Sequence, residues 1–327
     1  MTTTLAITGI GGFIGLRMAE RAIALGWQVQ GLELSPQAAD RARALGASVT
    51  VGDINDENAV RSALAGADCV FHTAAIVEED GARADYERVN VEGTRTVCRI
   101  AGAVGVRRFI HLSSVMVYGF DYPQDVGEDG PLDGQGNVYN DTKLASEQVA
   151  LGHHNPAAMQ VVVIRPGDVY GHASVPWVLR PIDLLRRRLF VLPDFGRGVI
   201  NHVHVDNLLD GVLLALDKMQ QSDAVAGQAF TITDGVATPC RDFFAHHARI
   251  AGKPLPLLPT WTIAGFLRAS APVWRLLGQK PPASPAGVQF LLRRHRYAIG
   301  KAQRVLGYQP RITLAAGMAD IAARYPR

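Results

Sequence analysis

Short apolar segments alternate with amphipathic segments through the first half of the chain. The pattern predicts strands at 5–7, 27–33, 48–51, 68–75, 108–114 and 160–164, and helices between them, including 36–45, 85–104 and one that begins near Val138. Strands that alternate with helices in this way are typical of parallel βαβ units. The sequence therefore predicts an α/β fold with a doubly wound parallel sheet.

A glycine-rich turn follows the first predicted strand. Gly9, Gly12 and Gly15 are spaced three residues apart, and an amphipathic helix pattern begins after Phe13. Glycines let a ligand approach the backbone, and the unpaired N–H groups at a helix N-terminus favour a phosphate. Strand, turn and helix together predict a pyrophosphate site for a dinucleotide, with TGxxGxxG spacing instead of GxGxxG.

The second predicted strand ends in an acidic residue, Glu33, 18 residues after Gly15. A carboxylate near this spacing binds the adenosine ribose of NAD and would repel the 2′-phosphate of NADP. The next residues, Leu34, Ser35 and Pro36, offer no cation for that phosphate. The sequence therefore predicts NAD as the cofactor; the alternative is an ordinary acid at a strand end.

Two further strand ends are expected to face the same ligand. Asp53 follows the third strand, where a carboxylate is well placed for the adenine amino group. Thr73, Ala74 and Ala75 end the fourth strand, and side chains this small would let a cofactor pass closely. His72 in that strand is expected to pack in the core and not to bind a ligand.

The regular alternation fades beyond Gly171. Proline-bounded helices are predicted at 176–188 and 261–277, and short strands at 203–205 and 230–232 are expected to return to the sheet. We therefore predict two interleaved parts, which are an NAD-binding domain over 1–166 joined by 203–233, and a smaller, mostly helical substrate-binding subdomain over 167–202 and 234–327.

Composition narrows the classes of protein. With 327 residues, 48% of them hydrophobic and 19% charged, the chain is expected to bury a sizeable core. A formal net charge of +3 gives no reason to expect a nucleic-acid partner. We expect no membrane span and no signal peptide, because apolar stretches are short and Met1 leads almost directly into the first strand. Three widely spaced cysteines fit a reducing cytoplasm.

Tyr139 and Lys143 are the side chains most suited to proton transfer. They lie four residues apart near the start of a predicted helix, so the phenol and the ammonium share one face. A nearby cation favours the phenolate and would lower the pKa of Tyr139 from its usual value of about 10. Ser114 ends a strand 25 residues before Tyr139, where its hydroxyl can hold the reacting oxygen. These three residues predict general acid/base catalysis.

The motifs in this order resemble those of the extended short-chain dehydrogenase/reductases, also called the NAD-dependent epimerase/dehydratase family. The resemblance covers nearly the whole chain and implies a Rossmann-type sheet. The matching segments are TGIGGFIG at 8–15, Asp53, TAA at 73–75, NVEGT at 90–94, LSSVMVYG at 112–119, YNDTK at 139–143, RPGDVYG at 165–171, VHVDN at 203–207 and LGYQP at 306–310.

The resemblance implies a role for each matching residue. Ser114 and Tyr139 would be catalytic, Lys143 would serve both catalysis and the cofactor, and Asn90 would support them. It also implies a homodimer, which many relatives form through the helices that carry Asn90 and Tyr139. The residues expected to contact the cofactor are Gly9, Gly12, Phe13, Ile14, Gly15, Glu33, Asp53, Ile54, Thr73, Ala74, Ala75, Tyr139, Lys143, Pro166, Asp168 and Val169.

Departures from the motifs bear on the substrate. Relatives that act on nucleotide sugars usually carry RDFVHVDD, whose arginine grips a diphosphate, whereas Ile200 stands at that place here. The apolar stretch 259–292 instead resembles the late segment of the 3β-hydroxysteroid dehydrogenase-like branch. Reductases of flavonoids and related ketones normally carry an arginine for NADP after the second strand, where this chain has Leu34.

We therefore predict an NAD-dependent oxidoreductase that interconverts a secondary alcohol and a ketone on a fairly apolar, sterol-like or alicyclic small molecule. One alternative is a nucleotide-sugar epimerase or dehydratase that retains its NAD. An alternative of another class is a non-catalytic NAD-binding or redox-sensing protein. In the late stretch, Trp261, Phe266, Trp274 and Leu277 are expected to line a hydrophobic pocket, with ordinary helix packing as the alternative.

Clusters of basic residues and histidines are expected at the surface. The runs Arg186–Arg188 and Arg293–Arg294 predict solvated helix faces, and contact with an acidic substrate group is the alternative. The pairs His153–His154 and His246–His247 suggest a metal site, but adjacent histidines on a helix diverge by about 100°. No carboxylate cluster lies at ligand spacing, so we expect surface histidines and no metal.

Overall fold

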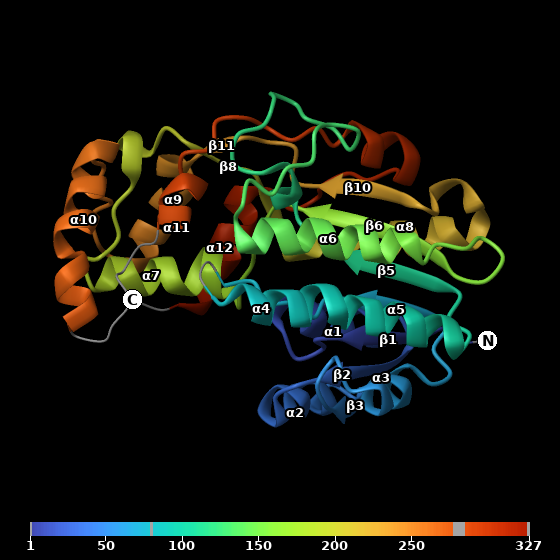
Figure 1. The fold of residues 1–327 in the computed structure, drawn as a ribbon. Helices are drawn as coiled ribbons and strands as arrows, with labels where there is room; N and C mark the ends of the chain where they lie inside the picture. Colours follow the sequence, from blue (N-terminus) through green and yellow to red (C-terminus); the bar gives the residue numbers. More distant parts are fainter. Residues whose placement is uncertain (1, 79–80, 277–284, 326–327) are drawn as a thin grey trace.

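The apolar runs of the first half, joined by β10 from the second half, form a seven-stranded parallel sheet in the order β10-β6-β5-β4-β1-β2-β3 (Figure 1). The computed structural model describes residues 2–78, 81–276 and 285–325. The predicted doubly wound α/β fold is confirmed. The strands of this sheet are β1 (Thr4–Thr8), β2 (Gln28–Glu33), β3 (Ser48–Val51), β4 (Cys69–His72), β5 (Arg108–Leu112), β6 (Gln160–Pro166) and β10 (Gln228–Ile232).

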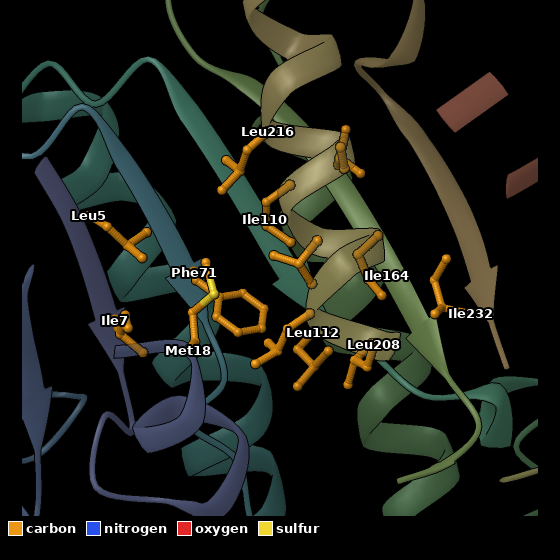
Figure 2. Packing of buried hydrophobic residues seen from close by; sticks show 14 of the residues in the cluster. Leu5, Ile7, Met18, Phe71, Ile110, Leu112, Ile164, Leu208, Leu216 and Ile232 are labelled. Carbon is orange, nitrogen blue, oxygen red and sulfur yellow. The ribbon is translucent and has the colours of Figure 1, made fainter. Parts of the chain in front are cut away.

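Helices cover both faces of the sheet because successive strand residues point to opposite sides. Leu5 and Ile7 of β1 pack in a cluster with α1 (Phe13–Ala24), α2 (Pro36–Ala44) and α8 (Val205–Gln221), and Figure 2 shows Leu208 and Leu216 of α8 in this cluster. Ala6, between them, packs in a second cluster with α3 (Glu57–Leu64), α5 (Gly93–Ala103) and α6 (Val138–Gly152). Each fully buried aliphatic side chain contributes about 1.5–3 kcal/mol.

The helix predicted over 85–104 contains a local widening. It begins as α4 (Arg83–Tyr86), continues as a π-helical segment (Glu87–Glu92) and ends as α5. The buried Asn90 lies in the π-helical segment, a form that often occurs at functional sites. Its side chain accepts a hydrogen bond from Ile76 N at 2.7 Å and donates to Ile76 O and to the Thr142 hydroxyl. The widened turn thus holds the loop that follows β4 against α6.

One prediction about the second half needs correction, and one helix was missed. Residues 230–232 do return to the sheet as part of β10, but 203–205 do not. Instead β9 (His202–His204) pairs with β7 (Asp168–Tyr170) in a separate two-stranded sheet, because the chain leaves the main sheet after Pro166. The sequence analysis also missed α8, although its apolar positions recur with helical spacing.

Four helices gather beyond the carboxyl ends of the strands, at one end of the molecule (Figure 1), which are α7 (Arg180–Arg186), α9 (Cys240–Ala251), α10 (Thr260–Leu276) and α11 (Pro285–Phe290). Aromatic and aliphatic side chains from them form a separate hydrophobic cluster around Phe243 and Phe244. No helix within the described part of the chain is long and apolar enough to cross a membrane. The other elements are α12 (Leu314–Arg324), β8 (Val199–Ile200), β11 (Thr238–Pro239), a π-helical segment at Val175–Leu179 and 3₁₀ turns at Val115–Tyr118 and Pro193–Gly196. A π-helical segment at Ala302–Leu306 and a 3₁₀ turn at Asp223–Val225 pack against α8 instead.

A buried ion pair joins α6 to the sheet. Arg165 at the end of β6 donates to Glu147 of α6 through Nε and Nη2, and both side chains are at most 4% exposed. Ser113 donates to the same carboxylate at 2.8 Å, and Arg165 Nη1 donates to the Tyr118 hydroxyl at 2.7 Å. These contacts fix how α6 lies across the carboxyl ends of β5 and β6.

We predict that Arg165→Met destabilises the protein by about 3–5 kcal/mol, because Glu147 would remain buried without the guanidinium that pairs with it. Urea unfolding followed by circular dichroism measures the change. Arg311→Met is the control, since the Arg311 side chain is 74% exposed in its pair with Asp210, and should cost under about 1 kcal/mol. Equal losses in the two variants would contradict the prediction.

Candidate active site

A cavity of about 1110 Å³ lies along the carboxyl ends of the strands, where the strand order reverses on either side of β1. This edge is the usual ligand crevice of doubly wound sheets. The structure brings nearly all of the predicted site residues to the cavity wall, and Asn90 is the exception. The predicted residues on the wall are Gly9, Gly12, Phe13, Ile14, Gly15, Glu33, Asp53, Ile54, Thr73, Ala74, Ala75, Ser114, Tyr139, Lys143, Pro166, Asp168 and Val169.

The glycine turn forms a bare backbone cradle. Gly9 has a φ of +69°, and a Cβ on Gly15 would lie 2.4 Å from the Gly9 carbonyl oxygen. Gly12 is the N-cap residue of α1, and within the described chain no side chain caps this helix and no acidic residue lies in its first turn. The unpaired N–H groups and the helix dipole therefore suit a phosphate, so these residues fit the predicted pyrophosphate.

The two predicted acids lie at the same end of the cavity. Glu33 accepts hydrogen bonds from Gly11 N at 2.9 Å and from Ser35 N at 3.1 Å. A backbone hydrogen bond from Asn55 is the main cause that lowers the pKa of Asp53, and Arg88, which pairs with it at 3.0 Å, acts in the same direction. Sequence reasoning missed Arg88, which reaches the cavity wall from the widened helix.

The predicted catalytic side chains meet where β5 ends and α6 begins. Ser114 follows β5, and its hydroxyl hydrogen-bonds the half-buried Tyr139 phenol. Asn137 caps α6 by accepting from Tyr139 N at 3.0 Å, so the tyrosine lies in the first turn. Lys143, one turn later, is 3% exposed and donates to the Leu112 carbonyl oxygen at 2.6 Å.

The acid–base properties of this group differ from the sequence-based expectation. Burial raises the pKa of Tyr139 above its ordinary value; the Ser114 hydrogen bond opposes that shift and the Asp168 charge adds to it. The predicted lowering by Lys143 is therefore wrong for this structure, in which the ammonium is directed to a backbone carbonyl. Burial lowers the pKa of Lys143 to about 8, and Glu147 opposes this shift.

A chain of buried hydrogen bonds connects the glycine turn to α6. The Thr94 hydroxyl donates to Asn90 O at 2.6 Å, so it must accept from His72 Nε2 at 2.9 Å. His72 Nδ1 then accepts from the Thr8 hydroxyl at 2.6 Å, and Asn90 donates onward to Thr142. Burial lowers the pKa of His72 to about 3, which agrees with this neutral tautomer. The predicted core role of His72 is confirmed, and Asn90 contacts α6 through Thr142.

One of the basic residues predicted at the surface is fully buried. Arg293 Nη2 donates to Asp168 Oδ2 at 2.6 Å, and the arginine side chain is 0% exposed. Asn201 N donates to the same oxygen at 2.9 Å. The neighbouring Arg294 is exposed and pairs with Asp194, so two adjacent arginines have opposite environments. A solvated face was therefore the wrong prediction for Arg293, because the segment after α11 turns inward behind the cavity wall.

The histidines of the two predicted surface pairs also differ in their exposure to solvent. His247 is 0% exposed and bonds the Trp177 and Phe243 carbonyl oxygens, so the prediction of a surface residue is wrong there, whereas His153, His154 and His246 are partly exposed. Adjacent positions on α9 point to different sides, which is why its sequence neighbour has another environment. Among the residues that the structure describes, no group of His, Cys, Asp and Glu could hold a metal ion.

The apolar end of the cavity is built from other residues than those predicted. Trp261 and Phe266 are 75% and 60% exposed and do not line it, whereas Ile263 between them does. The side chain of Trp274, and Leu277 as a whole, lie outside the described residues. Several elements instead supply an aromatic and aliphatic wall that the sequence analysis missed. The residues of this wall are Trp177, Leu184, Leu189, Phe190, Phe244, Phe290 and Leu291. Helical spacing in 176–188 and the pair Phe243–Phe244 were available signals.

We predict that Gly15→Ala weakens NAD binding about tenfold and destabilises the fold by about 1–3 kcal/mol. The new Cβ would meet the rigid Gly9 carbonyl, so the cradle must shift. Isothermal titration with NAD and thermal unfolding measure both effects. Gly102→Ala in α5, where an added Cβ meets nothing within 4 Å, is the control and should leave NAD affinity unchanged. Unaltered NAD affinity in Gly15→Ala would refute the proposed role of the glycine turn as a pyrophosphate cradle.

Known proteins resemble this chain over nearly its whole length. A ketoreductase of Stigmatella aurantiaca, named for 4-hydroxy-2-methyl-3-oxo-4-farnesyl-3,4-dihydroquinoline-1-oxide, is 29% identical over 318 residues, which are 95% of this chain and 93% of the relative. A 3-beta-hydroxysteroid dehydrogenase of Mycolicibacterium neoaurum is 28% identical over 336 residues, 98% of this chain and 90% of the relative.

Solved structures share the fold. UDP-glucuronic acid 4-epimerase from Bacillus cereus, in complex with UDP-glucuronic acid and NAD, aligns with a TM-score of 0.77 at 21% identity and covers 98% of this chain and 99% of its own. The model of the 3-beta hydroxysteroid dehydrogenase/isomerase family matches residues 6–254. The predicted resemblance to the extended short-chain enzymes is thus confirmed, and the chain belongs to the 3-beta hydroxysteroid dehydrogenase/isomerase family.

Proposed function

We propose that the chain is an NAD-dependent oxidoreductase that interconverts a secondary alcohol and a ketone on a bulky apolar molecule, sterol-like or alicyclic. The observation that carries this proposal is one cavity with the Ser114, Tyr139 and Lys143 side chains between a phosphate cradle and an apolar wall. Membership of a dehydrogenase family and relatives named as a dehydrogenase and a ketoreductase support the same chemistry.

The cofactor residues divide by the part of NAD they would hold. Gly9, Gly12 and Gly15 would hold the pyrophosphate, Glu33 the adenosine ribose and Asp53 the adenine edge. The remaining predicted contacts along the same wall, among them Phe13 and Val169, would hold the rest of the NAD molecule. NAD, when bound, supplies the site that accepts or returns a hydride.

Tyr139 would exchange the proton with the substrate oxygen. Because burial keeps the phenol protonated at neutral pH, Tyr139 is ready to donate to a ketone, and its phenolate would accept the proton of an alcohol at higher pH. Ser114 would hold the substrate oxygen beside the phenol. Lys143 would place its ammonium at the ribose, and Asn90 would keep α6 in position through Thr142.

The wall of the cavity favours an apolar substrate over a nucleotide sugar. Ile200 is buried where a diphosphate-binding arginine would stand in nucleotide-sugar enzymes, and the Arg293 guanidinium is already paired with Asp168. Trp177, Phe190 and their neighbours offer apolar surface instead. The two relatives are named for a steroid and for a farnesylated dihydroquinoline, which are large apolar molecules of the class proposed here.

Three further proposals concern organisation. We propose that 1–166 with 203–233 bind the cofactor, and that 167–202 with 234–327 bind the substrate. A homodimer through the helices that carry Asn90 and Tyr139, and a cytoplasmic location, also stay predictions. Light scattering coupled to gel filtration would measure the mass in solution, and a monomeric mass would refute the dimer.

We predict that Tyr139→Phe lowers turnover at least about a hundredfold and leaves NAD affinity nearly intact, because only the proton-transferring hydroxyl is lost. The measurement uses a panel of apolar alcohols and ketones, followed at the NADH absorbance band, with NAD titrated separately by calorimetry. Unchanged turnover in this variant would refute the mechanism. Purified protein that retains NAD and never releases NADH would instead favour an epimerase or dehydratase.

We predict that Ser114→Ala moves the alkaline rise of alcohol oxidation to higher pH. The Ser114 hydrogen bond lowers the pKa of Tyr139, so its removal raises that pKa, and a more alkaline solution is needed to form the phenolate. Profiles of kcat/KM against pH measure the shift. Ser113→Ala is the control, because Ser113 donates to Glu147, and its profile should keep the wild-type position. A shift to lower pH in Ser114→Ala would contradict the proposed contact.

A further inference from the structure

The end of the cavity that would hold the adenosine contains a cation, and this cation lies beyond residues 34–36 in the sequence. Arg41 of α2 lines the cavity together with Glu33, Leu34 and Ser35. Its Nη2 donates to the Gly11 carbonyl oxygen at 2.8 Å. The sequence-based prediction of NAD rested on Glu33 and on the absence of a cation at 34–36, whereas the fold brings Arg41 to the same place.

The packing of α2 explains the position of Arg41. Ser35 caps the helix, and its hydroxyl accepts from Ala38 N at 3.3 Å. Ala38 packs on the glycine turn so closely that a Cβ on Gly11 would lie 2.6 Å from the Ala38 Cβ. Arg41 follows Ala38 by three residues and so lies on the same face of α2. The side chain is thereby directed along the cavity wall.

The backbone of Gly11 forms hydrogen bonds with two side chains of opposite charge. Glu33 Oε2 accepts from Gly11 N at 2.9 Å, while Arg41 donates to Gly11 O at 2.8 Å. Both contacts are to one residue, so the carboxylate and the guanidinium lie within roughly 9 Å of each other. The carboxylate that would bind the ribose hydroxyls therefore has a guanidinium close by.

Other arginines on the cavity wall already have acidic partners. Arg88 pairs with Asp53 at 3.0 Å and Arg180 with Glu78 at 3.4 Å. Over 2–78, 81–276 and 285–325, Arg41 is the arginine of this wall without a carboxylate partner. A guanidinium has five N–H donors, and the Gly11 carbonyl takes one of those on Arg41. The others suit a phosphate, which arginine binds through paired hydrogen bonds.

We propose that Arg41 forms a subsite for the 2′-phosphate of NADP, so that the cavity accepts NADP(H) as well as NAD(H). The inference rests on the cofactor site of the proposed function and adds NADP(H) to the NAD that Glu33 predicts. Glu33 repels the added phosphate and Arg41 attracts it, so the two effects oppose each other. NADP is therefore expected to bind with an affinity within about tenfold of that for NAD.

The test compares two nucleotide fragments that differ only in the phosphate at the 2′ position, 5′-AMP and adenosine 2′,5′-bisphosphate. Isothermal titration on the full chain should detect both. Arg41→Gln should weaken the bisphosphate about tenfold and leave 5′-AMP within twofold, because one charge-assisted contact is lost. Glu33→Gln should strengthen the bisphosphate, because it removes the repulsive charge.

Arg43→Gln is the matched control on the same helix. Arg43 pairs with Asp40 at 2.9 Å and bonds the Val49 carbonyl oxygen, away from the glycine turn. It should leave both fragments unchanged. Equal effects of Arg41→Gln and Arg43→Gln, or wild-type protein that binds 5′-AMP but not the bisphosphate, would overturn the subsite. Fragment binding needs no turnover, so a protein that binds both fragments as expected but oxidises no alcohol would fail the proposed function and keep this inference.

Discussion

Charged side chains buried on α6 constrain the rest of the site. Lys143 and Glu147 lie one turn apart, at most 3% exposed, and burying an unpaired charge costs several kcal/mol. The surrounding structure must therefore bring a partner to each. Arg165 from β6 meets Glu147, and the last carbonyl of β5 meets Lys143. These partners can reach α6 only if the helix crosses both strand ends, and that crossing places Tyr139 beside Ser114.

The sequence predicted the parts of the molecule that local chemistry determines. Strands of consecutive apolar residues, the glycine turn and the spacing of Tyr139 and Lys143 are recognisable within a few residues of chain. In the structure the glycine turn, Tyr139 and Lys143 lie at the carboxyl ends of the strands. The roles of these residues rest on that placement and stay predictions. The residues that line the cavity agree closely with the site residues predicted from the sequence.

The errors arose where distant segments decide the environment. Arg293 and Arg294 are alike in sequence, yet only the three-dimensional path after α11 determines that one is buried against Asp168 and the other is exposed and pairs with Asp194. Hydrophobicity suggested Trp261 and Phe266 for the pocket, but a helix turns adjacent positions to different sides, and Ile263 faces inward. The pKa of Tyr139 was misjudged for a similar reason, since the depth of burial is a property of the whole fold.

The apolar wall has its own hydrophobic cluster, separate from the two clusters that hold the sheet. Phe190, Phe244 and Leu291 belong to this third cluster, whereas the glycine turn and α6 are supported by the other two. Changes of side-chain volume in the wall can thus be absorbed locally. In evolutionary terms the fold separates two selective pressures, because substitutions in the third cluster can change the apolar wall while the other two clusters keep the glycine turn and α6 in place.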